Sequence, residues 1–378
     1  MHIVCVFGTR PEAIKMAPII KQLRCHADKI TTQVWVTAQH RQMLDQVLQL
    51  FDIQPELDLN VMQEGQTPSQ VAALVLQRLE PHLMKERPDW VLVQGDTTTV
   101  MATAIAAYHL RIRVGHVEAG LRTHDKMNPF PEEMNRIIGD AISDLHFAPT
   151  QRARDNLLRE GIPDASIRVT GNTVIDALLD VAGRAWTPPP ESPLAGLPVL
   201  PDLPAPQVPR LLLVTAHRRE SFGQPMRDIC TALREIAMTR RSDVHLVYPV
   251  HLNPNVQEPV NALLTGLSNV TLLPPMDYGS LVYLMKRSHL VLTDSGGLQE
   301  EAPSLGKPVL VMREVTERPE AIEAGTARLV GTDPARIISE TCRLLDDEEE
   351  YARMAHAVNP FGDGHAAERI VAALMEKI

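Results

Sequence analysis

Short apolar runs alternate with amphipathic stretches along most of the chain, a pattern typical of a parallel sheet covered by helices on both faces. The runs predict strands in two series. The first series lies at residues 3–7, 33–37, 90–94, 113–116, 145–148 and 168–170. The second series lies at residues 211–215, 244–248, 270–273, 290–293, 309–311 and 328–330. Helices are predicted between the strands, so we expect two doubly wound α/β domains.

The alternation breaks between residues 186 and 209, because nine prolines fall within 187–209. Proline at this density predicts a linker. We therefore expect a first domain at 1–185 and a second domain at 210–361. Doubly wound sheets bind ligands beyond the carboxyl ends of their strands, so the two domains are expected to face each other across a ligand-binding cleft.

Composition and charge exclude several classes of protein. A length of 378 residues agrees with two domains. The formal net charge of −10 argues against nucleic-acid and anionic-membrane partners, because both attract basic surfaces. The four cysteines lie far apart without a CxxC pair, so neither a zinc site nor a disulfide framework is indicated, and a reducing cytoplasm is expected. No apolar stretch approaches membrane-spanning length.

The strongest chemical signal follows the strand predicted to end at Thr293. A turn of small residues comes next, and a helix is predicted over 298–305. The turn consists of Ser295, Gly296 and Gly297. Free N–H groups at a helix start suit a phosphate group, and glycine lets it approach the backbone closely. Glu301 is placed one turn into the helix to accept hydrogen bonds from sugar hydroxyls. An ordinary turn with a helix-capping serine is the alternative.

Charged residues also follow other predicted strands in both series. The basic residues that would suit an anion are Arg10, Lys15, His217, Arg218, His251 and Arg318. The acidic residues are Asp96, Glu118 and Glu132. Cations are slightly disfavoured at a helix start, so a bound anion accounts for Arg10 and Lys15 better than helix stability does. A solvated surface for the arginines, and an N-cap role for Asp96, are the alternatives.

Taken in order, the sequence words at these positions resemble one family, the non-hydrolysing UDP-N-acetylglucosamine 2-epimerases. The words are GTRPEAIKMAP (8–18), TAQHRQMLDQVL (37–48), GDTTT (95–99), GHVEAGLRT (115–123), PFPEEMNR (129–136), GNTVIDAL (171–178), HRRESFG (217–223), PVHLNPNV (249–256), TDSGGLQEEAPSLGKPVLVMR (293–313), TERPEA (316–321) and NPFGDG (359–364). The resemblance implies the two-Rossmann-like-domain, GT-B-like fold, in which a C-terminal helix at 362–378 packs back on the first domain.

The resemblance also implies the reaction, which interconverts UDP-N-acetylglucosamine and UDP-N-acetylmannosamine and supplies N-acetylmannosamine for bacterial surface polysaccharides. UDP departs, a 2-acetamidoglucal forms, and UDP returns after reprotonation at carbon 2. Such a route needs cations for the leaving diphosphate and carboxylates near carbon 2. By motif match, the catalytic candidates are Asp96, Glu118, Glu132 and His217. The candidates for binding UDP and substrate are Arg10, Lys15, Arg218, His251, Ser295, Gly296, Gly297, Glu301 and Arg318.

Further expectations follow from the same family. The reaction requires neither a nicotinamide cofactor nor a metal, which agrees with the lack of GxGxxG after the first predicted strand. A homodimer is implied, as is a possible allosteric substrate site at Gln39, His40 and Gln42, although Gly65 stands where some relatives carry arginine. A GT-B glycosyltransferase, a hydrolysing epimerase and an inactive nucleotide-sugar sensor are the rival interpretations.

Overall fold

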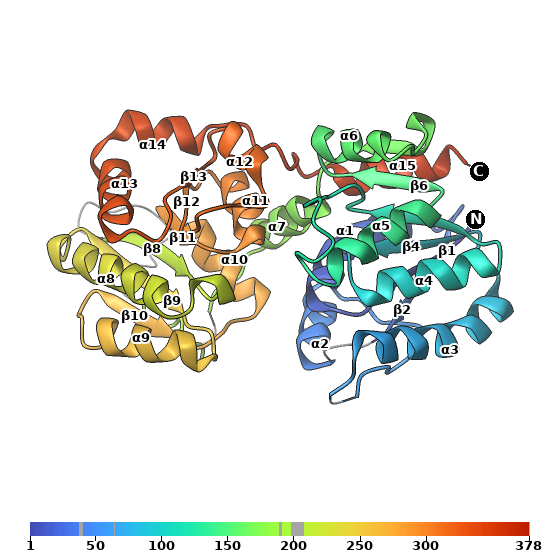
Figure 1. Cartoon of the computed structure of the whole chain (residues 1–378), viewed down its shortest axis with the longest axis horizontal. Helices are drawn as coiled ribbons and strands as arrows, with labels where there is room; N and C mark the ends of the chain where they lie inside the picture. Colours follow the sequence, from blue (N-terminus) through green and yellow to red (C-terminus); the bar gives the residue numbers. More distant parts are fainter. Residues whose placement is uncertain (38–40, 64, 189–190, 198–207, 378) are drawn as a thin grey trace. The chain divides into compact units, whose positions relative to one another are not determined.

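The computed structural model describes residues 1–377 apart from 38–40, 64, 189–190 and 198–207, and only the backbone of Arg41 and Gln42. It contains two compact units, each built on a parallel sheet (Figure 1). One unit comprises Met1–Ala177 together with Phe361–Ile378, and the other comprises Leu178–Pro360. The chain therefore leaves the first unit once and returns to it near its end.

The sheet of the first unit has, in the described part of the chain, seven strands in the order β3-β2-β1-β4-β5-β6-β7. They are β1 (His2–Phe7), β2 (Thr31–Val36), β3 (Leu57–Asp58), β4 (Trp90–Gln94), β5 (Arg113–Val117), β6 (Leu145–Ala148) and β7 (Ile167–Val169). The direction of winding changes between β1 and β4, which are paired in parallel. In such sheets ligands bind at this point, beyond the carboxyl ends of the strands.

Helices cover both faces of this sheet. They are α1 (Arg10–Arg24), α2 (Arg41–Leu50), α3 (Pro68–Glu86), α4 (Thr98–His109), α5 (Glu132–Ile142), α6 (Gln151–Arg159), α7 (Thr173–Gly183) and α15 (Ala366–Met375). Helices α3 and α4 share one hydrophobic core with the strands, whereas α15 packs against α1. The carboxylate of Asp176 in α7 accepts the N–H groups of Ala366 and Ala367, at 3.3 and 2.8 Å, and so holds the start of α15.

The sheet of the second unit has six strands among the described residues, in the order β10-β9-β8-β11-β12-β13. They are β8 (Arg210–Thr215), β9 (Val244–Pro249), β10 (Val270–Leu273), β11 (Leu290–Thr293), β12 (Val309–Val311) and β13 (Ala327–Leu329). Here the winding changes direction between β8 and β11. The helices are α8 (Gln224–Thr239), α9 (Pro254–Leu264), α10 (Tyr278–Arg287), α11 (Gly296–Ser304), α12 (Pro319–Glu323), α13 (Pro334–Asp346) and α14 (Glu348–Ala355).

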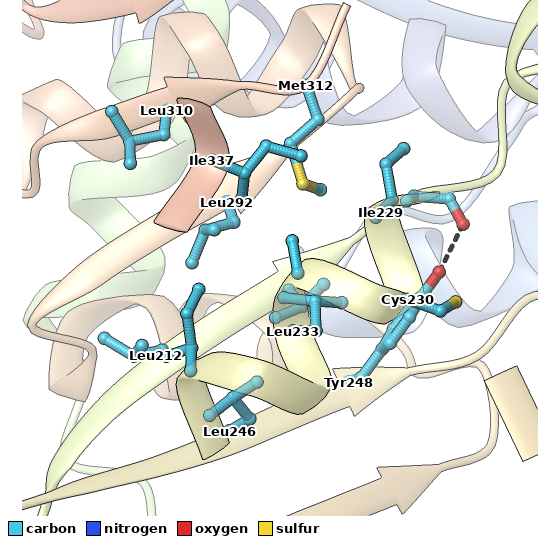
Figure 2. Packing of buried hydrophobic residues seen from close by; sticks show 14 of the residues in the cluster. Leu212, Ile229, Cys230, Leu233, Leu246, Tyr248, Leu292, Leu310, Met312 and Ile337 are labelled. Atoms are coloured by element: carbon cyan, nitrogen blue, oxygen red, sulfur yellow. Dashed lines mark hydrogen bonds between the residues drawn. The ribbon is translucent and has the colours of Figure 1, made fainter. Parts of the chain in front are cut away.

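Buried leucines from the central strands form the core of the second unit with side chains from α8 and α13 (Figure 2). The strand residues are Leu212, Leu246, Leu292 and Leu310, and the helix residues include Ile229, Leu233 and Ile337. The hydroxyl of Tyr248 donates to the carbonyl of Ala216 at 2.7 Å, so the polar end of this buried side chain is satisfied. Because the sheet is covered on both faces, its strands are continuous apolar runs rather than alternating ones.

The twelve predicted strands are all present, with ends shifted by at most two residues. The prediction missed β3, whose two residues are half-buried and exposed and give no apolar run. Helix α11 begins at Gly296 rather than at 298. None of the helices in the described ranges is both long and apolar enough to span a membrane.

The first compact unit ends at Ala177, before the predicted domain boundary at residue 185, and residues 178–183 continue α7 into the second unit. An uninterrupted helix leaves no break in the sequence pattern, so the division at Ala177 could not be seen there. Two contacts hold this segment in the second unit: Lys286 donates to the carbonyl of Ala182 at 2.7 Å, and the Trp186 ring meets Tyr283 edge-on with centroids 4.9 Å apart.

Replacing Leu233 with alanine should lower the free energy of unfolding by about 2–5 kcal/mol, because the side chain is fully buried in the core of the second unit. The control is Met238→Ala on the same helix, where the side chain is 54% exposed and a change below about 0.5 kcal/mol is expected. Guanidinium unfolding measures both. Equal midpoints for the two variants would contradict this description of the core.

Candidate active site

The turn after β1 is held by the buried carboxylate of Glu12. One oxygen of this carboxylate accepts the N–H groups of Gly8 and Thr9, at 3.0 and 2.7 Å, and the other accepts the Thr97 hydroxyl at 2.7 Å. Burial raises the pKa of Glu12, and these hydrogen bonds oppose the rise. A side chain at Gly8 would lie 2.0 Å from the Thr37 hydroxyl, so only glycine fits there. The turn carrying Arg10 is thus fixed to the turn after β4.

Asp96, in the turn after β4, is not a helix cap. The N-cap of α4 is Thr97, whose side chain accepts the N–H of Val100. Instead, the Asp96 carboxylate forms an ion pair with Arg136. The backbone carbonyl of Asp96 accepts a hydrogen bond from the side-chain amide of Asn135 at 3.0 Å. Both partners lie within the first five residues of α5, which begins at Glu132. The structure therefore brings Asp96 to the start of the helix that carries another predicted carboxylate.

A buried charged network lies behind these turns. His116 Nδ1 faces Asp140 at 2.6 Å, and His116 Nε2 faces the carbonyl of Gly95 at 2.7 Å. Both ring nitrogens therefore meet acceptors, which favours the doubly protonated imidazolium. The second oxygen of Asp140 accepts the N–H of Gly120 at 3.1 Å and Arg122 at 2.7 Å. The network thus supports the residues adjoining both Asp96 and Glu118.

The pKa values in this network reflect the pairing of opposite charges. Burial lowers the pKa of His116, but the charge and hydrogen bond of Asp140 outweigh that effect and raise it. Burial would raise the pKa of Asp140, but His116 and Arg122 lower it to about 2. Both shifts favour the charged form of the group, which is expected when buried charges are paired and hydrogen-bonded.

Glu118 follows β5 in a left-handed backbone conformation, with φ of 66°. This conformation is uncommon for residues other than glycine, and such strain is concentrated at functional sites. The side chain is only 8% exposed. Its Oε2 atom forms an ion pair with Lys15 from α1 and accepts the side-chain amide of Asn172 at 3.0 Å. The structure thus joins two predicted site residues, Lys15 and Glu118, through direct contact.

Neighbouring glutamates at the start of α5 differ sharply. Glu133 is buried, accepts the N–H groups of Thr123 and His124 at 3.0 Å each, and pairs with Arg136 at 3.2 Å. Glu132 is half-buried, and its side chain makes no hydrogen bond or ion pair with any residue that the structure describes. Glu133 therefore organises the preceding loop, whereas Glu132 is not engaged in holding the fold.

In the second unit, Asp294 joins the turns after β8 and β11. It is fully buried, and one oxygen accepts the N–H groups of His217 and Arg218 at 2.6 and 2.7 Å. The His217 ring stacks on His251 with centroids 5.4 Å apart. Burial lowers the pKa of His217, the charge of Asp294 opposes this, and His251 and Arg218 add to the decrease. The lowered pKa favours the neutral form of the His217 ring in the ligand-free site.

Helix α11 presents its first turn to a group of charged side chains. Ser295 is the N-cap, but its side chain makes no capping hydrogen bond, so the capping-serine alternative is not supported. A side chain at Gly296 would lie 3.8 Å from the guanidinium of Arg218, 3.9 Å from that of Arg318 and 3.9 Å from the carboxylate of Glu317. Two guanidinium groups thus lie at the positive end of a helix, an arrangement that suits an anion.

The same region holds buried donors without acceptors. Arg218 Nε and Arg313 Nη1 are buried and have no hydrogen-bond partner among the described residues. Buried polar atoms normally have partners, so these two support an anion site. Arg313 also pairs with Glu220 at 2.5 Å and with Glu317 at 3.4 Å. Burial would raise the pKa of Glu317, but the surrounding arginines lower it.

The carboxylate of Glu301, the residue predicted to bind sugar hydroxyls, lies close to the first turn of α11. It is 6% exposed, and its Oε1 atom accepts the Tyr278 hydroxyl at 2.6 Å. Its other oxygen lies 3.4 Å from where a side chain at Gly297 would begin. Tyr278 was not expected from the sequence, since it lies in a helix with no distinctive motif.

The predicted allosteric residues Gln39 and His40 lie outside the described residues, as does the side chain of Gln42. Three further residues that organise the site, Glu12, Asn172 and Asp294, were not predicted from the sequence. Each stands inside a sequence word that resembles the family, but none could be separated there from residues with simple turn-forming roles.

Comparison with known proteins identifies the family. A family model described as UDP-N-acetylglucosamine 2-epimerase matches residues 23–375. The chain belongs to this family. A UDP-N-acetylglucosamine 2-epimerase from Salmonella typhimurium is 56% identical over 380 residues, with 99% of this chain and 98% of the relative covered. These findings confirm the resemblance to the non-hydrolysing epimerases, which are isomerases.

Two solved epimerases also share the fold over their whole length. The Neisseria meningitidis UDP-N-acetylglucosamine 2-epimerase bound to UDP-N-acetylglucosamine is 45% identical, with a TM-score of 0.88 and complete coverage of both chains. The Methanocaldococcus jannaschii enzyme, in complex with UDP-N-acetylglucosamine and UDP, is 33% identical with a TM-score of 0.78, again over both entire chains. The GT-B-like fold class, with two Rossmann-like domains, is thus confirmed for this epimerase.

Replacing Asp140 with asparagine should lower the free energy of unfolding by about 3–5 kcal/mol, because it leaves the buried imidazole of His116 without its acidic partner and Arg122 with Glu160 alone. Asp155→Asn is the control, since this exposed carboxylate forms an ion pair with Arg154 at 3.7 Å and such pairs contribute about 0–1 kcal/mol. Urea unfolding at pH 7 measures both.

The free energy of unfolding that Asp140 contributes should depend on pH. A lowered folded-state pKa stabilises the protein above the unfolded-state pKa, and this stability is lost as pH falls through the folded-state value. For Asp140 the window runs from the ordinary 3.8 down to about 2. The stability difference between wild type and Asp140→Asn should therefore narrow across that window, and a difference independent of pH would contradict the assignment.

Proposed function

We propose that the protein interconverts UDP-N-acetylglucosamine and UDP-N-acetylmannosamine by eliminating UDP and adding it back. The observation that carries this proposal is the Glu118 carboxylate, held by Lys15 and Asn172 at the carboxyl edge of the first sheet. An anion site in the second unit alone would serve any enzyme of nucleotide sugars. A restrained carboxylate in the other domain provides the proton-transfer group that epimerisation needs.

The nucleotide would bind to the second unit. The amides of Ser295, Gly296 and Gly297 and the guanidinium groups of Arg218 and Arg318 would bind the diphosphate. His217, neutral and stacked on His251, would donate a hydrogen bond to it. Glu301 would accept hydrogen bonds from the ribose hydroxyls, with the Tyr278 hydroxyl orienting its carboxylate.

The chemistry follows from the weak acidity of carbon 2, which has no carbonyl beside it. When the bond from carbon 1 to the UDP oxygen breaks, UDP leaves with the electron pair and carbon 1 becomes electron-deficient. The proton on carbon 2 then passes to a carboxylate, and its bonding electrons form the double bond of 2-acetamidoglucal. Protonation of carbon 2 on the opposite face and return of UDP to carbon 1 give the epimer. The steps require no net oxidation and balance in protons.

The carboxylates proposed for proton transfer are Asp96, Glu118 and Glu132, of which one removes the proton and another supplies it. Lys15 and Arg10 were expected to stabilise the diphosphate. Since Lys15 forms an ion pair with Glu118, we assign it the role of keeping that carboxylate ionised. Arg10, at the first position of α1, keeps its proposed role beside the leaving group.

The remaining expectations are properties of the family. A homodimer, an allosteric site at Gln39, His40 and Gln42, and a supply of N-acetylmannosamine for bacterial surface polysaccharides stay predictions. The same holds for a ligand-binding cleft lined by both domains.

Incubation with UDP-N-acetylglucosamine in deuterated water tests the function directly. We expect deuterium at carbon 2 in both intact UDP-sugars, because the proton removed exchanges with solvent before reprotonation. Mass spectrometry and proton NMR of the products measure it. Free N-acetylmannosamine would indicate a hydrolysing epimerase, sugar transfer only to an added acceptor would indicate a glycosyltransferase, and unchanged substrate would indicate a binding protein.

Glu118→Gln and Glu132→Gln should each lower kcat by about two to four orders of magnitude, the usual contribution of general acid–base groups. The dissociation constant for UDP, measured by calorimetry, should stay within about threefold of wild type, since UDP binds to the second unit. Glu348→Gln, an exposed position in the first turn of α14, is the control. A variant that retains wild-type turnover would remove that residue from the mechanism.

A further inference from the structure

The turn before α7 is fixed from several directions. Gly171 adopts φ of 88°, and a side chain there would lie 3.2 Å from the Cα atom of Gly362. Asn172 is 3% exposed, and its backbone N–H donates to the carbonyl of Phe361 at 2.6 Å. The turn is thus packed against the segment where the chain re-enters the first unit, and Asn172 has little freedom to move.

The orientation of the Asn172 side chain follows from its contacts. Its Oδ1 atom accepts the N–H of Val174, in the first turn of α7, at 3.1 Å. The amide group must therefore present its NH₂ end in the opposite direction, where it meets Glu118 Oε2 at 3.0 Å. If the Asn172 amide were flipped, its NH₂ group would face the N–H of Val174, and its oxygen would face the carboxylate oxygen of Glu118. Neither pair could form a hydrogen bond.

From these contacts we infer that Asn172 is a positioning residue, which fixes the direction of the Glu118 carboxylate during proton transfer. The inference rests on the proposed function of Glu118. Lys15 alone would not do this, because its ammonium is a point charge on a flexible stem and follows the carboxylate as it rotates. The buried amide of Asn172 is held at its backbone and at its oxygen, so it defines one position for the carboxylate.

Asn172 lies next to both places where the chain passes from one unit to the other. The chain leaves the first unit at Ala177, within the helix that begins directly after Asn172, and returns at Phe361, whose carbonyl binds Asn172. Asp176 fastens the same helix to the start of α15. Both crossings between the units are therefore fixed together at the residue that holds Glu118. A displacement of either crossing would be transmitted to Glu118 through two hydrogen bonds.

Two substitutions separate positioning from a structural role. Asn172→Ser and Asn172→Asp both keep an oxygen that can accept the Val174 N–H, because serine and aspartate are good helix caps. Neither donates to Glu118 as the amide does, and aspartate places a second negative charge against it. For epimerisation we expect kcat to fall about tenfold in Asn172→Ser and about a hundredfold in Asn172→Asp, with KM and the UDP dissociation constant unchanged.

The order of the two variants is decisive. Aspartate has nearly the shape of asparagine, so a merely structural role predicts that Asn172→Asp retains more activity than Asn172→Ser. Positioning predicts the reverse. Asp333→Ser, which alters the N-cap of α13, is the control and should leave kcat unchanged. Thermal unfolding of each variant shows whether the fold is kept, and Asn172→Ser decides the question if Asn172→Asp does not fold.

The outcomes also distinguish this inference from the proposed function. If the wild-type protein epimerises UDP-N-acetylglucosamine but both folded variants retain its kcat, or the aspartate variant is the more active, the positioning role is overturned. If the wild-type protein exchanges no deuterium at carbon 2, the proposed function fails. A crystal structure of Asn172→Ser should then still show Glu118 in more than one rotamer, and a single unchanged rotamer would overturn the inference independently of activity.

Discussion

All strands of a parallel sheet end at the same edge, and this constraint determines where the chemistry of both units can lie. Where the winding changes direction, neighbouring loops diverge and leave backbone groups open to a ligand. In the first unit the turns after β1 and β4 meet through Glu12 and Thr97. In the second unit the turns after β8 and β11 meet through Asp294. A buried carboxylate therefore joins the central turns in each unit.

Two further roles of buried carboxylates, those of Asp294 and Asp140, differ in what each group binds. One carboxylate oxygen of Asp294 accepts the backbone N–H groups of His217 and Arg218, and these hydrogen bonds orient both residues. In the first unit, the buried carboxylate of Asp140 binds the side chains of His116 and Arg122, which lie behind the turns that carry the predicted site residues. Because a buried charge that loses its partner is very costly, these contacts keep the surrounding loops in one conformation. The strained backbone of Glu118 persists in that setting.

Much of this organisation was predictable from sequence, because strands covered on both faces are continuous apolar runs and the family's sequence words stand at their ends. Less visible features depend on side-chain direction. Glu132 and Glu133 are adjacent and chemically identical, yet only Glu133 turns inward to bind the preceding loop. The pairing of Lys15 with Glu118 joins residues 103 positions apart. Nor could the pattern reveal that α7 belongs to both units, since helical periodicity continues across the boundary.

The re-entry of the chain at Phe361 bears on how the protein is made. During synthesis, residues 1–177 leave the ribosome long before the segment that supplies the carbonyl for Asn172 and the helix start capped by Asp176. Domains generally fold as units during translation, with the N-terminal one first. Here the earlier domain must wait for the later one to be synthesised before its last helix can dock on α1. Until residues 361–378 are synthesised, the nascent first domain therefore exposes the apolar surface that α15 later covers, and chaperone binding would be concentrated there.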